Sequence, residues 1–481
     1  MANSSGSSVP DPRYIPRNIS IADDDSAFDL QIERKVSEVR MAIVPAVKIA
    51  RRMAAAQILA WYPKFRVAAR LDSVDHGIVM RREVRMGNIG PEFDIAEEAH
   101  ACTVGLVGKE PDPPYERPPL SKEYLAKEKG FERILLRPVA TWADKGIDLV
   151  LGCEVVTIDP GRGIAVLEDG REVCFEKMIW ACGGSPRSLT CEGAQLSGIH
   201  AVRTRRDVDA IMADLDAGAG KAVIVGGGYI GLEAASGLRK RGCDAVIVES
   251  LPRVLSRVAG EQISTFVEGV HRRNGVDFYL SATLQKLEGK GGRVSAAILG
   301  DGRQIDCDLV IVGIGIDPDV APLKEAGAQV ANGVSVDEFC RTSLPNIYAI
   351  GDCAQHSNEF AGGAQIRLES VQNANDMAVT AAKHICGKEE PYKATPWFWS
   401  NQFDIKLQTV GISTGYDATV LRGRFEDEKF SVIYLKEGRV IALDCINAAR
   451  DYVQGRKLVE ARASVAPERL ADVETALKMM L

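Results

Sequence analysis

The sequence has no paired or regularly spaced cysteines. Eleven cysteines are scattered along 481 residues without a C-x-x-C motif, so neither a disulfide framework nor a zinc site is indicated, and we predict no metal site. Most of these cysteines are expected to be small core residues of a protein in a reducing compartment. The scattered cysteines therefore predict a cytoplasmic location.

Long apolar runs and a surplus of positive charge are missing as well. No uncharged apolar stretch approaches the roughly 18 residues that a membrane span needs. Residues 1–25 lack the basic-then-apolar plan of a secretory signal. The net charge of −7 argues against a nucleic-acid partner held by bulk electrostatics. We expect no membrane span and no nucleic-acid partner.

What the chain does contain is the composition of an ordinary globular protein. Hydrophobic residues make up 46% and charged residues 26%, and 481 residues allow about three domains. Residues 1–30 are polar and punctuated by proline, which predicts disorder. The Arg- and Ala-rich segment at 32–70 is helix-like. We interpret it as a solvated helix or as unstructured chain, with a surface-binding helix as the alternative.

The most informative stretch is residues 221–250. An apolar strand leads into Gly-Gly-Gly-Tyr-Ile-Gly at 226–231, a helical run reaches Arg239, and a second apolar strand ends at Glu249. A bare Gly-x-Gly-x-x-Gly is also found in ordinary turns. Here the strand, the helix and an acid about 20 residues further on complete the dinucleotide-binding pattern.

Each glycine of this loop has a mechanical role. Gly226 permits a sharp turn, Gly228 leaves room for a pyrophosphate beside the backbone, and Gly231 lets the helix pack closely on the strand. The unpaired N–H groups and the positive dipole end of the helix then face the phosphates. This stretch therefore predicts a dinucleotide site.

Glu249 indicates which dinucleotide binds. A carboxylate at this strand end can accept hydrogen bonds from ribose hydroxyls, whereas a 2′-phosphate would meet like charge. NADH is favoured over NADPH. The nearby Arg253 keeps binding of both cofactors open as an alternative.

Two other segments suggest a second ligand site. Three prolines around Arg117 predict a rigid, non-helical loop at residues 114–122, either a solvated connector or the wall of an anion site. A β-branched and aromatic strand at 342–354 delivers Asp352 at its carboxyl end, where open α/β sheets bind ligands. An isolated Gly-Asp is otherwise typical of a turn.

Five motifs in a fixed order connect these observations. They are residues 114–122, 181–187, the glycine loop, 342–354 and 396–404. As a set they resemble the FAD-dependent, NADH-dependent ferredoxin reductases of bacterial oxygenase and cytochrome P450 systems. The resemblance covers roughly residues 101–481.

The resemblance implies an α/β fold with two Rossmann-like nucleotide-binding domains and a C-terminal α+β domain. The FAD domain would be interrupted by an inserted NAD domain, in a monomer or a dimer. The implied parts are an atypical, partly disordered segment at 1–100, the FAD domain at 101–186 and 318–396, the NAD domain at 187–317 and the C-terminal reductase domain at 397–481.

The resemblance also assigns residues to the two cofactors. Around FAD it places Glu110, Arg117, Lys122, Val155, Arg203, Asp352 and Val371. Around NAD it places Gly226, Gly228, Tyr229, Ile230, Gly231, Glu249 and Gly313. Without the resemblance, Arg203 would be interpreted as an exposed arginine and Val371 as a core valine.

Chemistry agrees with several of these assignments. Asp352 can accept hydrogen bonds from ribityl hydroxyls, and Arg117 or Arg203 can neutralise a phosphate. Lys122 would lie near the flavin ring, where a cation favours the electron-rich reduced form. Glu233 would approach the nicotinamide amide.

The implied reaction passes electrons from NADH through FAD to a [2Fe-2S] ferredoxin that serves an oxygenase or a cytochrome P450, in the oxidation of aromatic compounds, terpenes or xenobiotics. A hydride carries two electrons and an iron–sulfur cluster accepts one at a time, so a flavin is needed between them. Trp397 and Trp399 would mark the electron exit, with core packing as the alternative. Basic groups that would suit an acidic ferredoxin, or simply be solvated, are Arg422, Arg424, Arg456 and Lys457.

The competing enzyme class is the disulfide reductases, which share this architecture. Their chemistry needs an attacking thiolate and a resolving thiol beside the flavin. Residues 118–122 contain no cysteine, so thiol exchange is disfavoured.

The beginning of the chain departs from the family. The expected first glycine loop, for the FAD pyrophosphate, is missing from residues 75–90, and Lys109 stands where many relatives carry an acid. One hypothesis is that a reading-frame error replaced the ancestral first βα unit. The alternative is a flavin-deficient, NAD-binding pseudoenzyme that serves as an interaction module.

Overall fold

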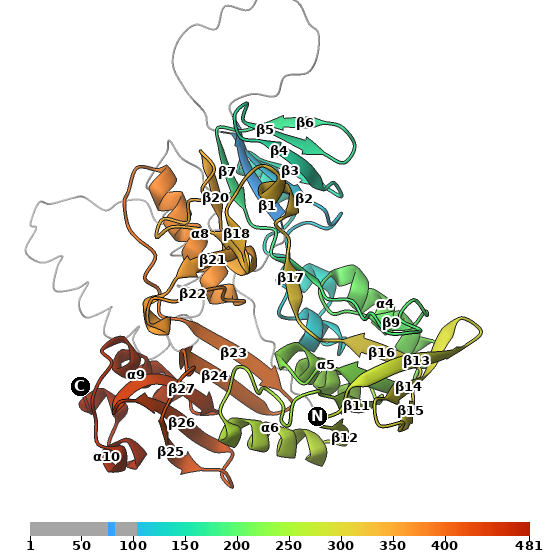
Figure 1. Ribbon diagram of the computed structural model, residues 1–481, viewed down its shortest axis with the longest axis vertical. Coiled ribbons are helices and arrows are strands. Elements are labelled where there is room, and N and C mark those ends of the chain that lie inside the picture. Colours follow the sequence, from blue (N-terminus) through green and yellow to red (C-terminus); the bar gives the residue numbers. More distant parts are fainter. Residues whose placement is uncertain (1–75, 82–102) are drawn as a thin grey trace, which may run out of the picture. The chain divides into compact units, whose positions relative to one another are not determined.

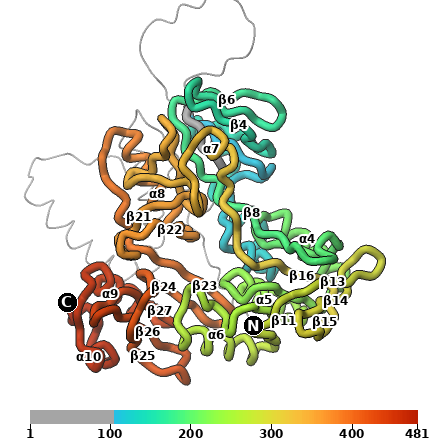
Figure 2. Tube along the Cα trace, viewed as in Figure 1, coloured from blue at the N-terminus to red at the C-terminus, as the bar shows by residue number. Residues whose placement is uncertain are grey.

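The computed structural model describes the backbone of residues 76–81 and all of residues 103–481 (Figure 1). Both stretches belong to one compact unit, Trp61–Leu481. The predictions for residues 1–30 and 32–70 lie outside the described residues. Figure 2 traces the path of the chain through the three regions described next.

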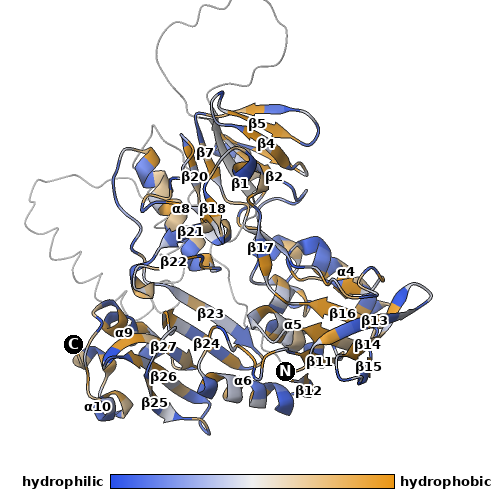
Figure 3. Ribbon diagram, in the orientation of Figure 1, coloured by the Kyte–Doolittle hydropathy of each residue, from blue (hydrophilic) through white to orange (hydrophobic). Residues whose placement is uncertain are grey.

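A five-stranded parallel sheet surrounds the predicted glycine loop. Parallel strands that are covered on both faces are apolar throughout. All four residues of strand β16 (Leu309–Val312) are buried, and this strand is strongly hydrophobic in Figure 3. In spatial order the strands are β12 (Val276–Tyr279), β11 (Asp244–Val248), β10 (Lys221–Val225), β16 (Leu309–Val312) and β9 (Ile199–His200).

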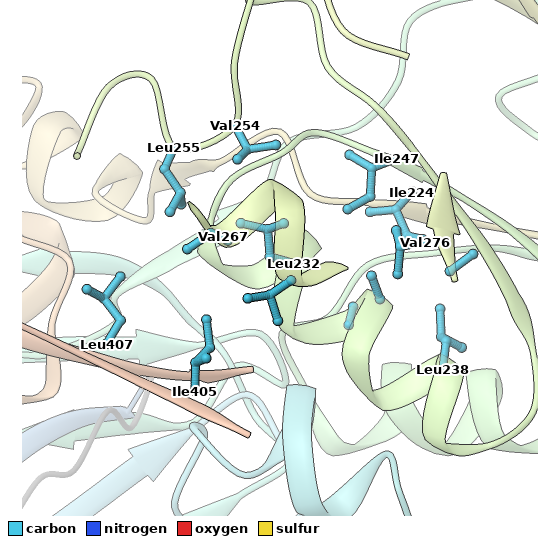
Figure 4. Packing of buried hydrophobic residues seen from close by; sticks show 14 of the residues in the cluster. Ile224, Leu232, Leu238, Ile247, Val254, Leu255, Val267, Val276, Ile405 and Leu407 are labelled. Atoms are coloured by element: carbon cyan, nitrogen blue, oxygen red, sulfur yellow. The ribbon is translucent and has the colours of Figure 1, made fainter. Parts of the chain in front are cut away.

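Helices α4 (Arg205–Asp216), α5 (Tyr229–Lys240) and α6 (Glu261–Arg273) pack with this sheet. One hydrophobic cluster includes Leu232 of α5 and Val267 of α6, and Figure 4 shows Ile405 and Leu407 of the C-terminal domain in the same cluster. Burying one such side chain contributes about 1.5–3 kcal/mol. The cluster therefore ties the NAD domain to the C-terminal domain. A small antiparallel sheet completes the NAD domain, with β13 (Leu284–Lys290), β14 (Arg293–Leu299) and β15 (Gln304–Asp306).

A second five-stranded sheet combines segments from both sides of the NAD domain. In spatial order its strands are β20 (Ile347–Ala349), β7 (Lys177–Trp180), β1 (His76–Arg81), β2 (Thr103–Gly108) and β3 (Ile147–Leu151). β20 is parallel to β7 and β2 is parallel to β3, but β1 runs antiparallel to both of its neighbours. His76 pairs with Gly108, so β1 begins at the edge where β2 ends.

Smaller elements flank this sheet. Three antiparallel strands are β4 (Val155–Asp159), β5 (Ile164–Leu167) and β6 (Glu172–Cys174). A four-stranded sheet holds β18 (Val330–Ala331), β19 (Gly333–Ser335), β21 (Ala354–Ser357) and β22 (Gln365–Ile366). The helices are α3 (Ala140–Asp144), α7 (Ala321–Glu325) and α8 (Val371–Ile385), with short turns η1 (Leu120–Tyr124), η2 (Phe131–Arg133), η3 (Gly351–Cys353) and η4 (Glu359–Ala361).

A two-stranded ribbon marks where the chain leaves the second sheet and returns to it. Its strands, β8 (Gly184–Pro186) and β17 (Ile316–Pro318), are antiparallel. The proposed domain boundaries at 186/187 and 317/318 fall in this ribbon.

The C-terminal domain is an antiparallel sheet with helices after it. In spatial order its strands are β23 (Trp397–Gln402), β24 (Ile405–Gly411), β27 (Arg439–Ile446), β26 (Lys429–Lys436) and β25 (Ala418–Arg424). Helices α9 (Ala449–Glu460) and α10 (Pro467–Ala471) and the turn η5 (Leu477–Met479) follow. Their buried residues, including Leu458 and Leu470, share a core with Leu443 of β27.

Arg422 holds the last segment of the chain onto this sheet. It is 3% exposed, and its guanidinium donates to the carbonyl oxygens of Leu470 at 3.1 Å and Thr475 at 3.0 Å and to that of Asp472. Its Nε donates to Asp451 at 3.0 Å. The prediction that Arg422 belongs to a basic docking surface is wrong, because the side chain is buried and its donors are occupied. Across residues 103–481, every helix is too short or too polar to pass through a lipid bilayer.

Candidate active site

The glycine loop between β10 and α5 has a tightly packed side and an open side. Gly226 has a φ of +110°, and a Cβ there would stand 2.3 Å from the carbonyl oxygen of Gly313. A Cβ on Gly231 would lie 2.1 Å from the carbonyl oxygen of Gly226. A Cβ on Gly228, the N-cap of α5, would meet no atom within 4 Å. The open side is therefore the one that the helix amino terminus faces.

Glu249 follows β11 and closes this loop. Its Oε2 accepts a hydrogen bond from the Gly227 N–H at 2.7 Å, and its Oε1 accepts one from the Leu251 N–H at 2.8 Å. The carboxylate is 8% exposed, so its charge acts on any ligand in the loop. Arg253 instead donates to Ala259 at 2.8 Å and to Ser264 at 2.5 Å, both close to it in the chain.

A second cavity, of about 130 Å³, lies beside the amino-terminal half of α5. Its walls come from η1, from the residues before and at the start of α8, and from β23. Predicted residues that line it are Arg117, Lys122, Arg203, Ile230, Glu233, Asp352, Val371 and Trp399. The structure therefore brings together most of the predicted FAD set with Glu233 and Trp399.

η1, which forms one wall of this cavity, differs from the conformation predicted for residues 114–122. Residues 114–122 were expected to be non-helical throughout, but Leu120–Tyr124 forms a π-helical turn. Proline restricts the residue before it and is compatible with the start of a helix. Pro119 has a φ of −67° and caps the turn, so the two prolines lead into η1 and place Lys122 at the cavity.

Glu233 is the most enclosed charge at the cavity, with its residue 2% exposed. Lys122 Nζ lies 2.6 Å from its Oε2, and the Ser121 hydroxyl donates to the same oxygen at 2.6 Å. The Ser400 hydroxyl donates to its Oε1 at 2.5 Å. A buried carboxylate needs such donors because burial removes its water. In this structure Glu233 thus faces Lys122 and two hydroxyl groups.

Two further charged groups border the cavity. Arg203 Nη1 lies 3.6 Å from Asp352 Oδ2. Arg117 is 8% exposed, pairs with Glu110 and donates to the Arg203 carbonyl oxygen at 2.6 Å. Tyr115 also donates to Glu110 at 2.5 Å, and burial raises the pKa of its phenol. Acidic and basic side chains therefore alternate along the contacts that lead from Asp352 at the cavity to Glu110.

Besides Glu249 and the glycine-loop residues other than Ile230, three predicted cofactor residues do not line this cavity. Glu110 contacts Arg117 and Tyr115 instead. Val155 is 8% exposed and belongs to the core below the second sheet. Gly313 lies against the glycine loop, where a Cβ would be 3.5 Å from the Gly231 Cα.

Aromatic rings separate this cavity from another one. Tyr229 packs on Phe398 with ring centroids 4.5 Å apart, and Trp397 lies 5.6 Å from Trp399. Tyr229, Trp397 and Phe398 also line a cavity of about 410 Å³ whose floor includes Asp444. Burial raises the pKa of the Tyr229 phenol, and the Asp444 and Glu233 carboxyl groups add to the rise.

Sequence reasoning missed Ser121, Ser400, Phe398 and Asp444. The hydroxyl of Ser400 reaches a carboxylate 167 positions away in the chain. Asp444 lies in an apolar strand and carries no motif. No local pattern distinguishes these residues from ordinary polar residues of a strand or a turn.

The described residues fit one dinucleotide fully and another in part. The open Gly228, the helix terminus and Glu249 match the phosphates and ribose of NAD. At the second cavity, Lys122, Asp352 and the amino terminus of α8 supply the cation, acceptor and N–H donors that suit a flavin ring and its ribityl chain. The site for the FAD phosphates is different. β1 runs antiparallel to β2 and β7, so the carboxyl end of β1 lies at the opposite edge of the sheet from the carboxyl ends of these two strands. Residues 82–102 lie outside the description.

Comparison with known proteins gives the same picture. Residues 93–378 match the pyridine nucleotide-disulphide oxidoreductase family, and residues 397–481 match the reductase C-terminal family. A ferredoxin–NAD(P)(+) reductase from Sphingomonas sp. is 53% identical over 387 residues, which cover 80% of this chain and 93% of that protein. The ferredoxin reductase subunit of 5,5′-dehydrodivanillate O-demethylase from Sphingobium sp. is 53% identical over 377 residues, 78% of this chain and 91% of that protein.

Two solved structures are also similar. A ferredoxin reductase from Rhodopseudomonas palustris has a TM-score of 0.76 and 35% identity, and covers 79% of this chain and 93% of its own. The covalent putidaredoxin reductase–putidaredoxin complex gives a TM-score of 0.75 with 36% identity, and covers 78% of this chain and 91% of the reductase.

The fold and the two adjoining sites define a two-dinucleotide oxidoreductase, in which an inserted NAD domain faces a flavin domain. The chain belongs to the pyridine nucleotide-disulphide oxidoreductase family and carries that group's reductase C-terminal domain. It is an enzyme of this oxidoreductase family, whose ferredoxin reductase members use FAD and NAD(H). Among the described residues there is no cluster of His, Cys, Asp or Glu suited to a metal ion.

Proposed function

We propose that the protein passes electrons from NADH through FAD to a [2Fe-2S] ferredoxin that serves an oxygenase or a cytochrome P450. The observation that carries this proposal is the ion pair between Lys122 and Glu233. This ion pair joins α5, the helix that follows the glycine loop, to η1, which forms one wall of the second cavity. A nicotinamide held by α5 and a flavin ring held by η1 would therefore meet at this pair.

FAD, when bound, accepts a pair of electrons and releases them singly. The chain's residues divide the remaining work. Lys122 would supply a cation at the ring, and Asp352 would accept hydrogen bonds from the ribityl hydroxyls. The amino terminus of α8, which begins at Val371, would supply N–H donors and a positive helix end to the flavin.

NADH is held by the loop at the start of α5. Gly228 leaves space beside the backbone for a pyrophosphate, and Glu249, which accepts from the Gly227 N–H, would also accept from the ribose and repel a 2′-phosphate. Ile230 lines the second cavity and Tyr229 lines the neighbouring cavity of about 410 Å³, so the residues between the loop and Glu233 would guide the nicotinamide toward the ring. This supports NADH as the electron donor.

Residues 118–122 disfavour thiol exchange as the alternative activity. A disulfide reductase needs two cysteines at the position of η1 and the prolines before it, and residues 118–122 have none. A [2Fe-2S] acceptor would take the electrons one at a time.

Trp399 is proposed as the exit, because it lines the cavity and contacts Trp397. Relatives named as reductases of ferredoxin, rhodocoxin and putidaredoxin support an iron–sulfur protein as the acceptor. Of the basic residues predicted to face it, Arg424 and Arg456 pair with neighbouring glutamates, Glu426 and Glu460. Lys457 stays a candidate contact. A relative named as the reductase of a p-cumate dioxygenase system supports a role in the breakdown of aromatic compounds.

The proposal includes the remaining assignments. Glu110, Arg117 and Arg203 would serve the phosphate end of FAD once the Glu110–Arg117 pair opens, and Val155 would act through its backbone. The reading-frame hypothesis for the first residues agrees with the family match beginning at residue 93. The proposed cytoplasmic location rests on the scattered cysteines of the sequence, which carry no disulfide pattern. Light scattering would decide between monomer and dimer.

The test is spectroscopic. The purified chain is reconstituted with FAD, and the visible band is followed during anaerobic addition of NADH and then of a panel of oxidised [2Fe-2S] ferredoxins. We expect bleaching by NADH and reoxidation by at least one ferredoxin. A chain that binds NADH but retains no chromophore would be the flavin-deficient pseudoenzyme, for which the relatives give no support.

A further inference from the structure

The Glu233 carboxylate is the meeting point of all three domains. Glu233 comes from α5 of the NAD domain, and Ser121 and Lys122 come from η1 of the FAD domain. Ser400 comes from β23 of the C-terminal domain. The C-terminal domain therefore reaches the Glu233 carboxylate through the Ser400 hydroxyl group.

The donors are distributed unevenly over the two carboxylate oxygens. Oε2 takes both Lys122 and Ser121, at 2.6 Å each, whereas Oε1 takes Ser400 at 2.5 Å. Ser400 is 0% exposed and Glu233 is 2% exposed, so bulk water does not compete for Oε1. Without Ser400, the carboxylate could turn and offer both oxygens to the Lys122 ammonium.

The Ser400 hydroxyl is itself held in one orientation. Gln402 Nε2 donates to Ser400 Oγ at 2.9 Å, so the single hydroxyl proton is left for Glu233. The end of β23 is fixed to α5 by a second bond, in which the Phe403 N–H donates to Ser236 Oγ at 2.8 Å. Ser236 lies one helical turn after Glu233. The spacing between strand and helix is thus set at two points.

We propose that Ser400 is a positioning residue, which restrains Glu233 so that its carboxylate meets Lys122 through one oxygen and leaves the ammonium charge directed into the cavity. The inference rests on the proposed function, because the cavity is taken as the site of the flavin ring. It adds a role for the C-terminal domain in setting the charge at that ring. The neighbouring electron exit would be a separate role of the same strand.

The first test follows Lys122 directly and needs no cofactor. Ser400→Ala is compared with the wild type, with Ser400→Thr, which keeps the hydroxyl, and with Ser431→Ala. Ser431 is a matched control, since it is a buried serine of the same sheet that donates to the Asp451 carboxylate at 3.2 Å. Each protein is acetylated at trace level, and the fraction modified at Lys122 is read by peptide mass spectrometry.

We expect Ser400→Ala to reduce acetylation of Lys122 about threefold, in line with the loss of one hydrogen bond. Ser400→Thr and Ser431→Ala should stay at the wild-type level. Equal reactivity in Ser400→Ala and the wild type, or an equal fall in Ser431→Ala, would overturn the proposal.

The second test measures the flavin midpoint potential by redox titration. A more fully neutralised Lys122 stabilises the reduced flavin less. Ser400→Ala should therefore shift the two-electron equilibrium about tenfold toward the oxidised form, a change of about 30 mV. An unchanged potential in a flavin-loaded variant also counts against the role. If the wild type holds no flavin, the proposed function fails while the acetylation result still decides the inference.

Discussion

Tyr434 donates a hydrogen bond of 2.5 Å to the carboxyl group of Asp444, and the N–H of Gly260 donates to the same phenol at 2.9 Å. Asp444 is 3% exposed on the floor of the cavity of about 410 Å³. Burial raises the pKa of Asp444 to about 7, although the bond from Tyr434 opposes the rise. In the unfolded chain the same carboxyl group has a pKa of about 3.9.

This difference predicts that the contribution of Asp444 to stability falls as the pH rises. Between about pH 4 and pH 7 the unfolded chain binds fewer protons than the folded chain, so the contribution of Asp444 is full below this window and is lost as the pH passes 7. Asp444→Asn stays neutral and avoids the loss. We expect the variant to gain up to about 4 kcal/mol over the wild type between pH 4 and pH 8, measured by urea unfolding. Parallel pH profiles for the two proteins would contradict this expectation.

Gly231→Ala should abolish tight NADH binding. The added Cβ would lie 2.1 Å from the Gly226 carbonyl oxygen, so the loop or α5 must shift. Overpacking of this kind costs about 1–3 kcal/mol. We expect the Kd for NADH, measured by calorimetry, to rise at least tenfold. Gly130→Ala is the control, since a Cβ there would meet nothing within 4 Å. An equal Kd for Gly231→Ala and Gly130→Ala would show that the close contact is unimportant.

Glu249→Ser should relax the choice of dinucleotide. Removing the carboxylate ends its repulsion of a 2′-phosphate and its hydrogen bonds to ribose. The ratio of NADPH to NADH affinity should rise about tenfold, which is about 1.4 kcal/mol. Fluorescence titration of both nucleotides measures this ratio. Glu325→Ser removes an exposed acid in α7 and should leave it unchanged. An unaltered ratio in Glu249→Ser would remove the basis for preferring NADH.

Arg422→Ala should release the end of the chain. The substitution removes the donor of the carbonyl oxygens of Leu470 and Thr475 and leaves Asp451 with Ser431 as its donor. Removing one partner of such a buried network costs about 3–5 kcal/mol. We expect lower stability in urea and faster proteolysis after residue 466.

Two variants make the Arg422 experiment specific. Arg424→Ala removes a side chain that is 71% exposed and should cost under about 1 kcal/mol. Arg422→Lys should restore little, because an ammonium lacks the planar fork that reaches several acceptors. Full rescue by lysine would mean that charge alone holds the segment.

The sequence predicts best where the determinant is local. The glycine loop, α5 and Glu249 follow from residues close together in the chain, and β10 and β11 have the predicted order. The turn at Leu120–Tyr124 was mistaken for loop because its prolines precede a helical turn instead of interrupting one. The contact between Ser400 and Glu233 depends on how two domains pack, so no spacing rule reveals it. Val155 was placed at FAD by resemblance, although its side chain is in the core.

The reversed course of β1 also bears on how this protein could be rebuilt. Its backbone pairs with β2 on one side and β7 on the other, and a strand edge accepts a neighbour of either direction. Backbone pairing at this position of the sheet therefore does not depend on the direction of the strand, whereas cofactor binding does. A strand taken from a relative could therefore replace β1 between β2 and β7 while the rest of this sheet keeps its pairing.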